Sequence, residues 1–198
     1  MLWVSVSGCN RKADNPELSA RERARELNDS AMTLSHNIAM RRSTHTYTDV
    51  VSLLNQALSI DSTYQLAYTN KITVLMNAEQ YGKAIHLLRK LIKKRPHETH
   101  AKIQIGIAYE LRGNTAKSQQ YLKRALEDYS RQIDAQPDSL NLFLDRAFVK
   151  LLLGRKKEAI KEIDSLSSAH PNSMRVKSMT EVIERTQKED IVQNHTGP

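Results

Sequence analysis

The sequence predicts an all-α fold in which helix pairs stack into an α-solenoid that ends in a C-terminal capping helix. One pattern of small and apolar residues returns after about 34 residues, a period typical of stacked helical hairpins. Within each copy the apolar positions recur at helical spacing. Two Phe, one Trp and six Gly among 198 residues also suit thin Ala- and Leu-filled layers better than a turn-rich sheet.

Four copies of the pattern are expected, over residues 31–64, 65–98, 99–136 and 137–171. Ala57, Leu91 and Ala125 occupy one position of the repeat at steps of 34, whereas the equivalent Leu166 follows after 41. The seven extra residues amount to nearly two helical turns. We therefore expect the second helix of the third copy to lengthen without changing its buried face and to project by about 10 Å.

The second copy shows what one repeat should look like. An apolar run from Leu66 to Met76 is interrupted near residues 77–80, and a second run ends at Pro96, which cannot continue a helix. Gly113 and Gly154 fall at the corresponding turns of later copies, where a left-handed backbone favours glycine. Around the repeats we expect a polar tether and helix over 10–30, the capping helix over 172–188 and a disordered tail over 189–198.

These copies resemble the tetratricopeptide repeat family, whose pattern places a large residue at position 4, small residues at positions 8, 20 and 27, aromatic residues near 11, 17 and 24, and proline at 32. No copy matches in full, but the register is constant. The matching residues are Tyr68, Tyr81, Ala84 and Pro96 in the second copy, Gly106, Tyr109 and Ser118 in the third, and Phe143, Ala147, Ala159 and Pro171 in the fourth.

The resemblance implies a concave surface, formed by the first helix of each pair, that binds a peptide or protein partner. A Lys/Asn/Arg clamp for a terminal carboxylate, found in some relatives, is absent here. The alternative is that the apolar members, such as Ile103 and Phe148, are packed beneath the C-terminal helix. Transferred positions give Leu66, Thr69, Thr73, Met76, His100, Ile103, Ile107, Glu110, Asn141, Leu144 and Phe148.

The single cysteine, Cys9, ends a short apolar stretch. Residues 6–9, Val-Ser-Gly-Cys, resemble the lipobox of bacterial lipoproteins, in which the cysteine is acylated. The segment lacks the basic region and long apolar run of an export signal, so we expect a partial signal in residues 1–9. The alternative is an incidental cysteine in a cytosolic protein. Two or three acyl chains at Cys9 would suffice for stable membrane anchoring.

The net charge of +8 is concentrated in one place, since residues 65–98 hold seven basic and two acidic residues. Cations at the end of a helix also interact favourably with its dipole, so this stripe needs no ligand to explain it. An anionic partner is the alternative. Nucleic acid is not expected, because no aromatic residues interleave with the basic ones and no binding motif is visible. The stripe consists of Arg89, Lys90, Lys93, Lys94 and Arg95.

No catalytic or metal-binding constellation is found. His97 and His100 are three residues apart but straddle a turn without a third ligand nearby, and the other histidines are dispersed. Gly-rich phosphate loops and nucleophile motifs are also missing. We therefore expect no enzyme, no cofactor, no metal and no small-molecule substrate.

The leading hypothesis is a non-catalytic scaffold for protein–protein interaction, anchored in a Gram-negative cell envelope through acylated Cys9. Its repeats would face the periplasm or the exterior. The first alternative is a cytosolic adaptor without a lipid anchor. The second is a binder of an anionic ligand through the basic stripe.

Overall fold

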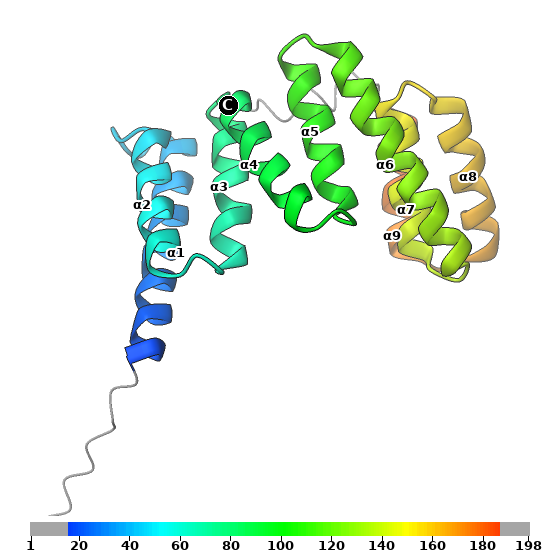
Figure 1. Ribbon diagram of the computed structural model, residues 1–198. Coiled ribbons are helices and arrows are strands. Elements are labelled where there is room, and N and C mark those ends of the chain that lie inside the picture. The colour runs from blue at the N-terminus through cyan, green and yellow to red at the C-terminus, as the bar shows by residue number, and fades with distance from the viewer. Residues whose placement is uncertain (1–15, 187–198) are drawn as a thin grey trace, which may run out of the picture. The chain divides into compact units, whose positions relative to one another are not determined.

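The computed structural model describes residues 16–186, with side chains from residue 19 onward. In this part the chain is all α, and no strand is present (Figure 1). The chain divides into two compact units between Lys71 and Ile72, within the third helix. The helices are α1 (Pro16–Ala39), α2 (Tyr47–Ile60), α3 (Gln65–Asn77), α4 (Tyr81–Lys94), α5 (Thr99–Leu111), α6 (Thr115–Ala135), α7 (Leu140–Leu152), α8 (Lys156–Ala169) and α9 (Met174–Arg185).

The first unit is built on the hairpin of α1 and α2. Small residues of α1, among them Ala24 and Ala31, are fully buried, as are Val50 and Leu54 of α2. At the start of α2 the Asp49 carboxylate accepts a hydrogen bond from the Thr46 N–H at 2.8 Å, which satisfies a donor that the helix itself leaves unpaired. The helix expected within residues 10–30 is part of α1, which continues to Ala39.

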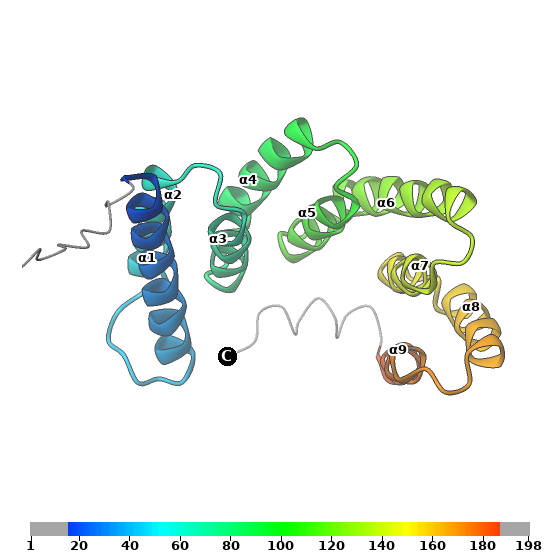
Figure 2. The same ribbon diagram turned by 90° about the horizontal axis from the view of Figure 1, so that it is seen from below.

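In the second unit, helices alternate between two rows. Figure 2 shows α5, α7 and α9 in one row and α4, α6 and α8 in the other. The two rows pack against each other through fully buried side chains. Examples are Ala84 on α4, Ala147 on α7 and Ala159 on α8. Because small side chains let paired helices approach closely, these positions explain why the repeat keeps its spacing along the chain.

The turns between paired helices use a left-handed residue at one fixed place. Gly113 and Gly154 have φ of 72° and 75°, as the sequence predicts. Glu79 occupies the equivalent place of the second repeat, with φ of 56°. A side chain in this conformation is strained where glycine is not. The backbone conformation is therefore set by the helix–turn–helix geometry and not by the presence of glycine.

The lengthened second helix of the third repeat is α6, which has 21 residues where α4 and α8 have 14. Its added turns are fastened to the beginning of α5. Asp128, a buried carboxylate, pairs with Lys102 of α5 and with Arg131. Further along, the Gln132 side-chain amide donates to the Thr99 hydroxyl at 2.9 Å. The extension is thus a packed part of the second unit.

Candidate functional site

The last helix, α9, takes the place of a first helix in a fifth repeat. It begins at Met174, one repeat length after Leu140, where α7 begins. At the eighth residue of this register the earlier repeats have Gly106 and Ala147, both buried, whereas α9 has the exposed Glu181. A charged side chain there is unsuited to the close approach of a second helix. The register of Met174, together with the charge of Glu181, would have been enough to extend the predicted concave surface to α9 from the sequence alone.

A groove lies between α7 and α9, with a volume of about 350 Å³. Its floor is Leu144, which is 4% exposed, and its walls include Met174 and Val182, which are 73% and 41% exposed. Large apolar side chains with this exposure are uncommon in the described part of the chain. Polar groups edge the groove, and its other lining residues are Asn141, Asp145, Arg175, Ser178 and Met179.

Asp145, one of the lining residues, influences a buried tyrosine of α6. Tyr129, a buried residue of α6, lies close enough to the Asp145 carboxylate to be affected by its charge. Burial first, and then the charge of Asp145, raise the pKa of the Tyr129 hydroxyl above its usual range. The Asp145 carboxylate lines one edge of the groove.

The α9 wall of the groove is fastened at both ends. The Ser173 hydroxyl accepts a hydrogen bond from the Val176 N–H at 3.4 Å, which caps the start of the helix. Lys156 of α8 donates through Nζ to the backbone oxygens of Glu184 and Thr186, at 2.8 and 3.3 Å. Such a lysine satisfies carbonyl groups that the end of a helix leaves unpaired.

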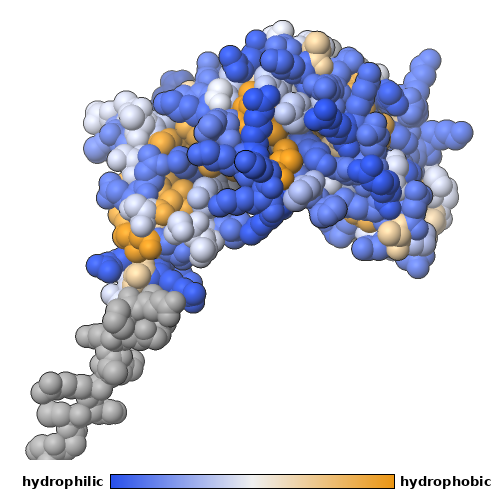
Figure 3. All heavy atoms as spheres, viewed as in Figure 1, coloured by the Kyte–Doolittle hydropathy of each residue, from blue (hydrophilic) through white to orange (hydrophobic). Residues whose placement is uncertain are grey.

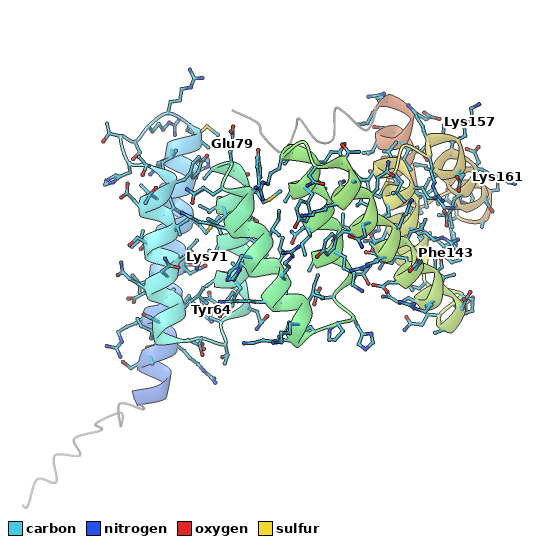
Figure 4. All side chains as sticks on the ribbon, turned by 45° about the horizontal axis from the view of Figure 1, so that its top comes forward. Tyr64, Lys71, Glu79, Phe143, Lys157 and Lys161 are labelled. Atoms are coloured by element: carbon cyan, nitrogen blue, oxygen red, sulfur yellow. The ribbon has the colours of Figure 1, made fainter. Side chains whose placement is uncertain are left out.

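A second hollow, of about 480 Å³, lies between α7 and α8 and is lined in part by Phe143 and Lys161 (Figure 4). Its charges pair with one another. The Glu162 carboxylate accepts from Arg146 Nε at 2.8 Å and from Lys150 Nζ at 2.7 Å. Its side chain is 8% exposed, so the ion pairs are largely removed from water. We assign this cluster a role in stability, and the α7–α9 groove is the better candidate for binding.

The predicted concave residues are distributed unevenly. Asn141 and Leu144 meet in the α7–α9 groove. Buried positions are occupied by Met76, Ile103 and Ile107, which therefore contribute little surface to a partner. Leu66 is 52% exposed in the first unit. Of the remaining residues, Thr69, Thr73 and His100 are exposed, and Glu110 and Phe148 are half-buried.

Other predicted features lie elsewhere. All five residues of the basic stripe are exposed, on α4 and at its C-terminal cap, Arg95. Cys9 lies outside the described residues. Within residues 16–186 no three His, Cys, Asp or Glu side chains are grouped as metal ligands. No helix in the same range has the length and apolar character required to span a membrane.

The fold and the register define this chain as an α-solenoid of stacked helix pairs. A family model described as a tetratricopeptide repeat matches residues 101–131, which lie in α5 and α6 and the turn between them. A thermophilic tetratricopeptide repeat protein of Thermus thermophilus, TTC0263, resembles the chain with a TM-score of 0.54 and 18% identity, over 87% of each chain. This likeness shows that the chain has the tetratricopeptide-type fold.

A weaker similarity is found to MamA, from residue 41 to its end, of Desulfovibrio magneticus RS-1. The TM-score is 0.47 and the identity 17%, over 76% of this chain and 77% of that one. No curated protein matches the sequence.

Proposed function

We propose that this protein is a non-catalytic scaffold that binds a segment of another protein in the groove between α7 and α9. The observation that carries the proposal is an open apolar groove on the helix row that the resemblance assigns to binding. Leu144 forms the floor of the groove and is already buried. Met174 and Val182 expose apolar surface to solvent, and a bound partner would cover this surface. Covering such surface is the main source of affinity in peptide recognition.

The groove favours a particular chemistry in its partner. Two methionines line it, and the flexible thioether side chain adapts to apolar groups of different shape. Asp145 and Arg175 place opposite charges at its edges. We therefore expect a short segment with one Leu- or Met-sized anchor, flanked by polar or charged residues that match these two.

Substituting Val182 by glutamate should weaken this binding strongly without unfolding the protein, because Val182 is already partly exposed. Ile60→Glu is the matched control, since Ile60 is 39% exposed on α2 of the other unit. Proteins captured from detergent-solubilised native membranes should be the same for the parent and Ile60→Glu, and a subset should be lost with Val182→Glu. For the purified partner, we expect an affinity loss of about tenfold or more, equivalent to at least about 1.4 kcal/mol. Equal retention by all three proteins would refute the groove as the binding site.

We also propose that Cys9 is acylated and anchors the scaffold in the cell envelope of a Gram-negative bacterium, with the repeats facing the periplasm or the exterior. The support is the resemblance of residues 6–9 to a lipobox. Each buried methylene contributes about 0.8 kcal/mol, so two or more acyl chains would govern the partition.

Expressed from its natural start in its own host, the protein should enter the detergent phase, and Cys9→Ser should release it into the aqueous phase. Mass spectrometry of the mature N-terminus gives the direct readout. A free thiol on Cys9 in protein recovered from the cytosol would favour the cytosolic adaptor instead, and it would leave the groove proposal intact.

A further inference from the structure

Positive charge is more concentrated in the structure than the basic stripe suggests. Residues 81–126, which include α4, α5 and most of α6, contain eleven Lys or Arg and two Glu. Their net charge is +9, whereas the whole chain carries +8. All of these residues belong to the second unit. One segment therefore accounts for the excess charge of the entire protein, and the remainder is close to neutral.

A cluster of tyrosines and cations brings the three helices of this segment together. Arg89 of α4 donates hydrogen bonds to the hydroxyls of Tyr109 on α5, at 2.7 Å, and Tyr121 on α6, at 3.3 Å. The two rings stack with their centroids 5.8 Å apart. The guanidinium group is thus fixed in position by side chains from two other helices.

Two more cations complete the cluster. Lys117 Nζ lies 5.4 Å from the centroid of the Tyr109 ring, and Arg124 Cζ lies 5.7 Å from that of Tyr121. Among the described residues, none of Arg89, Lys117 and Arg124 has a carboxylate within 4 Å. Ring faces compensate part of the repulsion between these charges. An anion would compensate the rest.

The cluster offers hydrogen-bond donors to such an anion. A tyrosine oxygen that accepts from Arg89 keeps its own hydrogen for donation. Lysine and arginine side chains carry donors and no acceptors. The ligand must therefore be rich in acceptors and negatively charged.

Two kinds of polyanion fit this face poorly. A membrane surface would call for apolar side chains that insert beside the charges, yet no large hydrophobic residue is exposed between 81 and 126. Single-stranded nucleic acid needs open rings on which bases stack. Here aromatic residues do lie among the basic ones, contrary to expectation, but Tyr109 is 5% exposed and stacks on Tyr121.

We propose that the basic face of α4–α6, centred on Arg89, Lys117 and Arg124, binds an acidic segment of a polypeptide. Carboxylates can accept hydrogen bonds from all three cations and from the hydroxyl of the half-buried Tyr121. Hydrophilic residues predominate over α6 in Figure 3, as such a contact requires. This face is separate from the α7–α9 groove, so the proposal does not depend on the function proposed above.

The probe is a fluorescein-labelled peptide of about ten glutamates, which extends over about 33 Å and therefore exceeds the length of α4. Fluorescence anisotropy at low salt should show binding that a glutamine peptide of equal length lacks. The Lys117→Gln/Arg124→Gln protein should bind at least about tenfold more weakly. Lys157→Gln/Lys161→Gln removes the same charge from exposed positions on α8 (Figure 4) and should change the affinity less than about twofold.

Tyr121→Phe distinguishes binding at a structured site from non-specific electrostatic attraction, because it preserves every charge and removes one hydroxyl group. We expect it to weaken binding about threefold, and an unchanged affinity would count against the geometry. Equal losses in both double variants, or no binding of the glutamate peptide, would overturn the proposal. So would tighter binding of a single-stranded oligothymidylate of the same charge, which would assign this face to nucleic acid.

Discussion

Substituting Glu162 by alanine should lower the free energy of unfolding by about 2 to 4 kcal/mol. The substitution leaves Arg146 and Lys150, whose side chains are 22% and 18% exposed, as cations without their carboxylate. Removing one member of a buried ion pair is costly because the remaining charge is both desolvated and unpaired. Chemical denaturation followed by circular dichroism measures the change.

Glu158 provides the matched control, because it lies one helical turn earlier on α8 and is exposed. Its nearest cation, Arg155, is 4.0 Å away. Exposed pairs of this kind contribute at most about 1 kcal/mol, so Glu158→Ala should be nearly neutral. If the two variants unfold at the same denaturant concentration, the paired charges in the α7–α8 hollow do not stabilise the fold.

Gly106→Ala should also destabilise the protein, by roughly 1 kcal/mol or somewhat more. A Cβ atom at this position would lie 2.8 Å from both Cγ and Cδ2 of Leu122, so α5 and α6 would have to move apart. Overpacking in a core costs about 1 to 3 kcal/mol, and alanine recovers up to about 1 kcal/mol through its higher helix propensity. The measured change in unfolding free energy is the difference between the two effects.

The same substitution at Gly82 should have the opposite sign. The nearest atom to a Cβ there is Arg112 Nη1, at 3.8 Å, so the added methyl group meets no obstacle. Gly82→Ala should leave stability unchanged or raise it by up to about 0.5 kcal/mol, because Gly82 lies in the first turn of α4. Destabilisation by both substitutions would mean that space at the helix crossing is not the cause.

The helix pairs could be predicted from the sequence because their spacing is a local property. A small residue at a helix crossing and a glycine at a tight turn are required by steric limits within one repeat, and both recur from one repeat to the next. Exposure is different. Ile103, Ile107 and Leu144 lie on the predicted concave positions yet are buried, since exposure depends on which neighbouring helix covers the position. Periodicity alone does not contain that information.

The basic face illustrates the same limit. In the sequence, Tyr109 and Tyr121 lie 20 and 32 residues after Arg89. Local sequence patterns therefore do not predict that these three side chains are in contact. Packing of α4, α5 and α6 is what brings them together. By contrast, the position of α9 as the first helix of a fifth repeat could be predicted from the sequence, because Met174 continues the register of Leu140.

The position of α9 has a consequence for the energetics of binding. It packs against α7 and α8 and has two buried apolar side chains, Val176 and Ile183, whereas internal helices such as α5 have many more. Helices with few buried contacts undock at a lower free energy than the rest of a domain. Because the groove exists only while α9 is docked, the apparent dissociation constant of a partner equals the intrinsic one divided by the docked fraction. Lys156, which holds the end of α9, should therefore influence the affinity for the proposed partner without contacting it, through the equilibrium between docked and undocked α9.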